Sequence, residues 1–70
     1  MADTRYLVRL CEYREDGTVR LIRDGFTGTQ YTRAADARRD AVDSVYAKGP
    51  GSFAEIVRIQ VLSTIRHIDL

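Results

Sequence analysis

Cysteine, proline, methionine and histidine each occur once in this 70-residue chain, and tryptophan is absent. A single cysteine, Cys11, cannot form an internal disulfide, and no charged and then apolar leader opens the sequence. Both features are typical of proteins that stay in a reducing compartment, so we expect a cytoplasmic protein. One histidine and one cysteine also give none of the usual metal-ligand spacings, and we expect neither a metal nor another cofactor.

Long apolar runs and lysine are scarce as well. The longest apolar-rich stretch, residues 56–68, is interrupted by Arg58, Gln60 and Arg66, which excludes a bilayer span of about 20 apolar residues. The formal net charge is only +1, so the whole chain exerts no strong pull on nucleic acid or anionic lipid. Ten of the eleven basic residues are arginine. This bias reflects either GC-rich coding or an arginine-rich binding surface, because the guanidinium group suits carboxylates, phosphates and aromatic faces.

The composition that remains is that of a globular domain. Hydrophobic residues make up 44% and charged residues 30% of the sequence, far from the composition of disordered chains. A chain of this length has room for one domain, residues 1–70, with one core. Such a core usually contributes about 3–5 kcal/mol, and association is a common way to gain further stability. We therefore expect a single domain that forms a homodimer.

Two segments of strand-forming residues flank an Asp-Gly pair and predict a β-hairpin. Residues 5–14, RYLVRLCEYR, form the first strand and residues 18–23 the second, with Asp16-Gly17 as a two-residue turn. This turn would place Arg14 opposite Val19. The alternation then predicts a core face that carries Tyr6, Val8, Leu10, Val19 and Leu21. The second face would carry Leu7, Arg9, Cys11, Tyr13, Arg20, Ile22 and Phe26.

A helix is expected to follow the hairpin. Residues 24–31 contain two glycines and several polar side chains, which predicts a bend with a short third strand at residues 29–31. Thr32 is expected to cap a helix over residues 33–47, and Gly49-Pro50-Gly51 would end it. Helical spacing predicts that one arc packs on the sheet: Ala34, Ala35, Ala37, Ala41, Val42, Val45 and Tyr46.

Two charged features accompany this helix. Arg38 falls near the middle of the apolar arc, and its stem is expected to cover the alanines while the guanidinium group ends in water or on Glu12 or Glu55. On the opposite side an acidic stripe is expected, made of Asp36, Asp40 and Asp43.

Residues on opposite faces alternate again over residues 53–61, and this pattern predicts a further strand after the helix. One of its faces would carry Val57, Ile59 and Val61, and the other Ile56, Arg58 and Gln60. The tail that follows, residues 62–70, keeps β-forming residues, so either a bulge or second hairpin folds it back or it pairs with another chain. The fold class predicted is α+β: an antiparallel sheet of three to five strands with one helix on one face, in the order β-β-(β)-α-β.

Catalytic chemistry finds little support in the sequence. A thiol nucleophile needs a base within hydrogen-bond distance and a third group that orients the base. Cys11 lies among apolar strand residues, where a free cysteine normally acts as a small hydrophobe, and His67 lies in the tail. The stretch Gly25-Phe26-Thr27-Gly28 matches the GxxG pattern of KH-type RNA loops, but that loop joins two helices and this one follows a strand. We therefore expect a protein that is not an enzyme.

Binding is the function that the sequence favours. The candidate partner-binding residues are those of the mixed sheet face and of the acidic stripe: Arg9, Tyr13, Arg20, Phe26, Arg58, Asp36, Asp40 and Asp43. Tyrosine, phenylalanine and arginine are enriched where proteins bind proteins. The same residue types also stack on bases and contact phosphates of single-stranded nucleic acid. The near-neutral charge favours a protein partner, or a nucleoprotein complex, over direct nucleic-acid binding.

Residues 15–42, EDGTVRLIRDGFTGTQYTRAADARRDAV, resemble the hairpin-then-helix half of HicB-type antitoxin domains. The shared features are a turn glycine, a glycine near the end of the second strand and a Thr-capped, alanine-rich helix. The chain departs from that family where the usual proline of the second strand's end is missing and where a strand follows the helix. The resemblance implies a regulatory module that blocks a partner. Small domains of this kind also look like the inhibitors that phages and plasmids carry against host defences, anti-CRISPR proteins among them.

Overall fold

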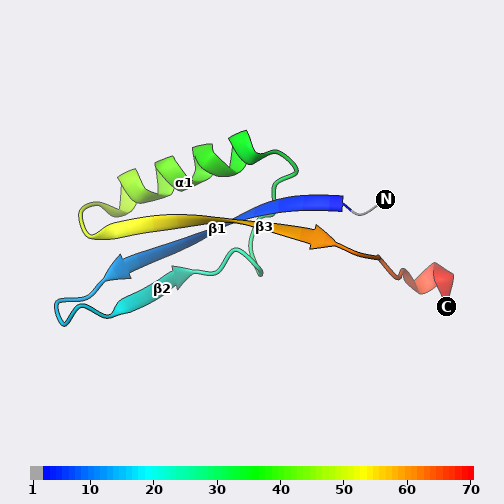
Figure 1. Cartoon of the computed structure of the whole chain (residues 1–70), viewed down its shortest axis with the longest axis horizontal. Helices are drawn as coiled ribbons and strands as arrows, with labels where there is room; N and C mark the ends of the chain where they lie inside the picture. The colour runs from blue at the N-terminus through cyan, green and yellow to red at the C-terminus, as the bar shows by residue number, and fades with distance from the viewer. Residues whose placement is uncertain (1–2) are drawn as a thin grey trace.

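The computed structural model describes residues 3–70 and contains three strands and one long helix (Figure 1). Strands β1 (Asp3–Tyr13), β2 (Val19–Arg23) and β3 (Ser52–Val61) form one antiparallel sheet in the order β2-β1-β3. Helix α1 (Ala34–Lys48) connects β2 to β3 and lies along β1 and β3 on one face of the sheet. The predicted α+β fold is thus confirmed, with three strands in the order β-β-α-β.

The β1–β2 hairpin turns through three residues rather than the two predicted. The Arg14 backbone N–H donates to the Thr18 carbonyl at 2.8 Å, and Gly17 adopts a φ of 84° that favours glycine. The Asp16 side chain accepts hydrogen bonds from the backbone and the hydroxyl group of Thr18 and so holds the wider loop. Tyr13 consequently lies opposite Val19, so the predicted register is wrong by one residue.

This shift exchanges the two faces of β2, because directly opposite residues of an antiparallel pair point to the same side. Leu21 lies opposite Cys11, and Arg20 lies opposite Glu12. Val19 and Leu21 therefore leave the predicted core face, and Arg20 joins the helix side. A bulge between Leu10 and Cys11 then leaves Ile22 as an extra residue in β2, so that Arg23 pairs with Leu10.

The segment between β2 and α1 runs beside β1 without forming the short strand predicted at residues 29–31. Tyr31 makes a single isolated bridge to Tyr6, with two backbone hydrogen bonds of 2.7 Å. Gly25 is buried against Leu7 and Val8 of β1, where a side chain would have no room. This segment thereby covers part of β1 that β2 is too short to reach.

Helix α1 begins one residue later than predicted, with Arg33 rather than Thr32 at the N-cap, and no side-chain hydrogen bond caps it. The helix ends at Lys48, next to the Gly49 that was predicted to end it. Gly49 takes a φ of 96°, and its N–H donates to the Val45 carbonyl. Ala37 and Ala41 are buried against Val8, which lies on the predicted core face of β1. The predicted packing arc was too wide, since Val42 and Tyr46 are exposed.

Strand β3 pairs with β1 over its whole length, from Ser52 opposite Glu12 to Val61 opposite Asp3. The tail after Val61 does not fold back on the sheet. It extends away from the body (Figure 1) and ends in a short 3-10 helix, η1 (His67–Asp69). Within residues 3–70, no helix has both the length and the apolar character needed to cross a bilayer.

Candidate protein-binding surface

The sheet face turned away from α1 is apolar at its centre, and we call it the outer face. The pairings of β1 with β2 and β3 define its members: Asp3, Arg5, Leu7, Arg9, Cys11, Tyr13, Val19, Leu21, Phe53, Glu55, Val57, Ile59 and Val61. Leu7 and Cys11 are buried at its centre. Residues 3–70 therefore form a sheet with large side chains on both sides, although the helix covers one side alone.

At the hairpin end of the outer face, Tyr13, Val19 and Leu21 are exposed, and the half-buried Phe53 lies against Tyr13. The rings of Tyr13 and Phe53 lie 4.7 Å apart between centroids, tilted by 31°. Tyr13 is 62% exposed, and Val19 and Leu21 are each about half exposed. Aromatic side chains held in place by a neighbour are the usual anchors of protein interfaces, because they bury much area at little cost in conformational entropy.

The arginines predicted to share this face are divided between the two sides of the sheet. Arg9 stays on the outer face, where its guanidinium group lies 3.8 Å from the Glu55 carboxylate. Arg20 pairs with Glu12 at 3.1 Å on the helix side. Arg58 lies opposite Tyr6, which packs against the helix core. The outer face therefore carries charges of both signs, with Arg5 and Arg9 alongside Asp3 and Glu55, and it does not gather the predicted arginines into one group.

Phe26 lies in the loop after β2, next to the buried Gly25, and is about half exposed. Its backbone N–H donates to the Asp24 carboxylate at 2.9 Å, which stabilises the turn. The ring thus belongs to the loop that runs beside β1 near Leu7 and not to a strand. Of the predicted aromatic and basic set, Arg9 and Tyr13 lie on the outer face itself.

The acidic stripe of the helix is divided as well, because Asp40 is bound into a polar network. Its carboxylate accepts hydrogen bonds from Arg23 at 2.9 Å, from the Tyr31 hydroxyl at 2.9 Å and from Ser44 at 2.8 Å. This network, the Asp40 cluster, joins the end of β2 and the following loop to α1. Asp36 and Asp43 remain exposed beside a shallow depression that also includes Arg39.

The Asp40 cluster changes the ionisation of two of its members. Partial burial would raise the pKa of the Asp40 carboxyl, but the hydrogen bonds from Ser44, Arg23 and Tyr31 outweigh it and hold the pKa below the ordinary 3.8. The hydrogen bond that Tyr31 donates to this carboxylate raises the pKa of the phenol above its ordinary 10.0. Both shifts favour the same state, an ionised carboxylate that accepts from a neutral phenol.

We expect Asp40→Asn to lower the free energy of unfolding by about 1–3 kcal/mol, because charged hydrogen bonds are replaced by weaker ones. A carboxyl with a lowered folded-state pKa contributes stability above its unfolded pKa, and that contribution disappears as the pH falls through the folded value. The difference between wild type and variant should therefore shrink between about pH 5 and pH 2.

Urea unfolding followed by circular dichroism across this range would measure both effects. Asp43→Asn is the matched control, since it makes the same chemical change on the same helix at an exposed position. Equal losses of stability in the two variants would show that the Asp40 cluster does not stabilise the fold.

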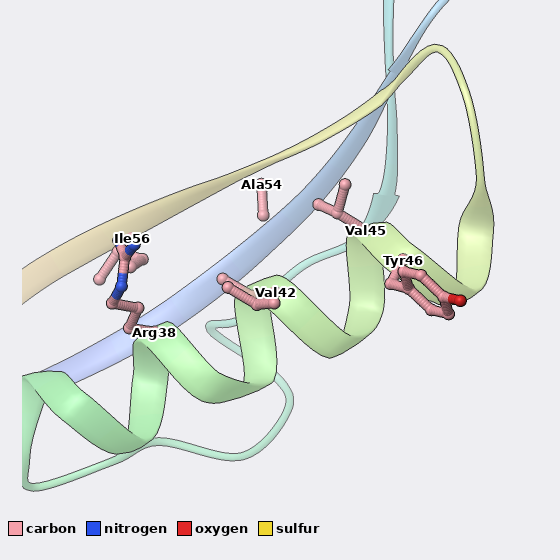
Figure 2. Close-up of a pocket in the computed structure, with 7 residues that line it drawn as sticks. Arg38, Val42, Val45, Tyr46, Ala54 and Ile56 are labelled. Carbon is pink, nitrogen blue, oxygen red and sulfur yellow. The ribbon is translucent and has the colours of Figure 1, made fainter.

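A second apolar feature, which the sequence did not reveal, lies between α1 and the free edge of β3. This groove has a volume of about 440 Å³ and is lined by Arg38, Ala41, Val42, Val45, Tyr46, Ala54 and Ile56. Figure 2 shows Val42 and Tyr46 on the open side of the helix and Arg38 extending toward Ile56. Glu12 and Glu55, the acceptors expected for Arg38, instead pair with Arg20 and Arg9.

The two residues considered for nucleophilic chemistry are far apart in the fold. Cys11 is buried in the middle of the sheet opposite Phe53, near the start of β3. His67 lies in η1, past the opposite end of β3. Among residues 3–70, no three side chains of histidine, cysteine, aspartate or glutamate gather as a metal site would require.

Comparison with known proteins gives no relative from which a role could be transferred. No family model, no curated protein and no solved structure matches the chain.

Proposed function

We propose that the chain is a cytoplasmic, non-enzymatic module that binds a protein partner through its outer face. The observation that supports this proposal is the exposed Tyr13 ring, which lies against the half-buried Phe53 beside Val19 and Leu21 at the hairpin end of the outer face. A compact group of aromatic and aliphatic side chains is the usual centre of a protein interface. The free cysteine is consistent with a reducing compartment.

The charge distribution favours an apolar and nearly neutral partner surface. Arg9 is paired with Glu55 on the outer face, and Arg20 is turned to the helix side, where it is paired with Glu12. Single-stranded nucleic acid needs a positively charged groove that follows the phosphates, and its binding weakens steeply with salt. The hairpin end of the outer face instead offers apolar contacts, with the Arg9–Glu55 ion pair beside them.

A module that covers an apolar patch on another protein acts by occlusion. We therefore extend the proposal to an inhibitor of the type carried by phages and other mobile elements against host defence complexes, anti-CRISPR proteins included. Occlusion requires no chemistry from the chain itself. It agrees with the position of Cys11, whose thiol is buried among apolar side chains and behaves there as a small hydrophobe.

Tyr13→Ala is expected to weaken partner binding by about tenfold or more, the loss typical when an anchoring aromatic side chain is removed. Tyr46→Ala is the matched control, because it removes an exposed tyrosine from the helix on the other side of the sheet. Wild type and both variants would be immobilised and exposed to nuclease-treated lysate from a GC-rich bacterium. The captured protein would then be purified, and its affinity for each variant measured by calorimetry.

The proposal predicts one partner that binds wild type and the Tyr46 variant alike and the Tyr13 variant weakly. Equal affinity for all three proteins would overturn the assignment to the outer face. Gel shifts with single-stranded and duplex oligonucleotides form the second arm. Tight binding to an oligonucleotide that falls steeply with salt and is weakened by Arg9→Ala would show that the partner is a nucleic acid and not a protein.

A further inference from the structure

The free edge of β3 is long and regular, and it has no bulge, proline or lysine. Strand β3 pairs with β1 over residues 52–61 with no bulge, and within residues 3–70 no other strand pairs with it. It contains no proline, and Glu55 and Arg58 are its charged residues. Natural edge strands are commonly shortened, bulged or marked by proline and lysine, because an unmodified edge pairs with another strand.

The tail beyond β3 is apolar, exposed and already extended. Leu62, Ile65, Ile68 and Leu70 are between 76% and 90% exposed. Arg66, near the end of this stretch, has the backbone angles of a strand, with φ −98° and ψ 155°. The tail thus prolongs the edge of β3 beyond the point where β1 ends, and several large side chains along it have no contact that would bury them.

Symmetry restricts how two copies of this edge can pair. Two antiparallel β3 strands are related by a twofold axis perpendicular to the sheet, which leaves both helices on the same side. Residues that face the helix then oppose residues that face the helix, and outer-face residues oppose outer-face residues. The remaining variable is the residue that lies on the axis.

Placing Ile59 on the axis sets each large apolar residue opposite another apolar residue and each charged residue opposite a polar one along residues 53–65. The pairs that result on the outer face are Ile59 with its own copy, Val57 with Val61, Phe53 with Ile65, and Glu55 with Ser63. On the helix side they are Ile56 with Leu62, Arg58 with Gln60, and Ala54 with Thr64. Directly opposite pairs of this kind are what stabilises two adjacent strands.

Registers with the axis on a neighbouring residue set charged side chains opposite each other or opposite apolar ones. An axis at Arg58 sets two guanidinium groups directly opposite each other, which is unfavourable. An axis at Gln60 sets Arg58 against Leu62 and Glu55 against Ile65. An axis at Val57 sets Arg58 against Ile56. The residue order of β3 and its tail therefore selects Ile59.

We propose that a second copy of the chain pairs with β3 in this register and forms a twofold dimer with one continuous six-stranded sheet. In this dimer, residues 62–66 of the partner lie beside residues 52–56, along the groove between α1 and β3. Leu62 of the second copy packs next to Ile56, below the side of the helix that carries Val42 and Tyr46. The pairing covers the apolar residues that residues 3–70 leave exposed at the groove.

The dimer interface overlaps the surface used in the proposed function at Phe53, which lies against Tyr13 within its own chain and opposite Ile65 of the second copy in the dimer. It occupies the β3 edge and the groove on the helix side, while Tyr13 and Leu21 lie toward the opposite edge of the sheet. The outer faces of the two copies become one larger surface. A monomeric chain would therefore not contradict the proposed partner binding through Tyr13. Equally, a chain that binds no partner could still form the dimer.

Ile59→Glu tests the axis, because it sets two carboxylates opposite each other in the dimer while each lies opposite Arg5 within its own chain. Sedimentation velocity should give twice the chain mass for wild type and the mass of one chain for the variant, with the dissociation constant raised by about tenfold or more. Leu21→Glu is the control, since it adds the same charge to the outer face on the other edge strand and should remain dimeric.

Cysteine pairs test the register directly and do not depend on how the Glu variant folds. Arg58→Cys mixed with Gln60→Cys should form a disulfide-linked dimer under mild oxidation, because directly opposite residues lie within the limit of about 7 Å between Cα atoms. Each variant alone should link poorly. Linking by Arg58→Cys alone or by Gln60→Cys alone would select another axis and overturn the register. Monomeric wild type at several hundred micromolar would overturn the dimer.

Discussion

Gly25→Ala is expected to leave a large part of the domain unfolded at 25 °C. A methyl group at this position would lie 2.5 Å from the Val8 carbonyl oxygen and 2.9 Å from both the Leu7 Cβ and the Val8 nitrogen. Backbone atoms of the central strand cannot move aside without breaking pairs to their neighbours. Overpacking of this kind costs about 3 kcal/mol or more, against the roughly 3–5 kcal/mol that a domain of this size has in total.

Urea unfolding and thermal melts followed by circular dichroism would measure the loss, which corresponds to about 4–8 °C in Tm for each kcal/mol. Gly28→Ala is the matched control in the same loop, because a methyl group there meets its nearest neighbour, the Asp24 carbonyl oxygen, at an ordinary 3.6 Å. A Gly25 variant as stable as the Gly28 variant would mean that the loop can leave β1 at little cost.

Leu7→Ala should be the next most damaging change, with a loss of about 2–5 kcal/mol. The Leu7 side chain is completely buried, although it belongs to the face that the helix does not cover. Val57 lies opposite it and Gly25 packs against it, so a cavity would open between the loop and the sheet. The free energy of unfolding from urea titrations would give the size of the effect.

Leu70→Ala provides the comparison for Leu7, since it removes the same atoms from a side chain that is 90% exposed and should change stability by less than about 0.5 kcal/mol. Similar values for the two variants would contradict the burial of Leu7. They would also show that the loop around Gly25 does not seal this part of the outer face.

The fold could be predicted because its local signals agree with one another. The hairpin follows from alternating residues on both sides of Gly17, and the end of the helix follows from Gly49. The faces of β2 could not be predicted, because they depend on one extra residue in the turn. Asp16 decides that point by holding Thr18 through two hydrogen bonds, an interaction that the Asp-Gly pattern does not reveal.

The candidate surface was predicted in part. Tyr13 and Arg9 lie on the outer face as the alternation of β1 requires, whereas Arg20 and Arg58 point to the helix side. Helical spacing could not show how much of the apolar arc the narrow sheet would cover, so the groove beside Val42 was missed. One residue in the sequence could have indicated the groove. Arg38 lies in the middle of the apolar arc, and a charged residue there indicates that this part of the arc is open to solvent.

The central strand β1 supplies every large buried side chain among residues 3–70: Leu7, Val8, Leu10 and Cys11. The helix contributes alanines to the interior, and no residue of β2 or β3 is buried. Sequence divergence should therefore be tightly limited along one strand and tolerated over most of the remaining chain. A scaffold built in this way can accept many changes on its exterior while a single segment preserves its shape.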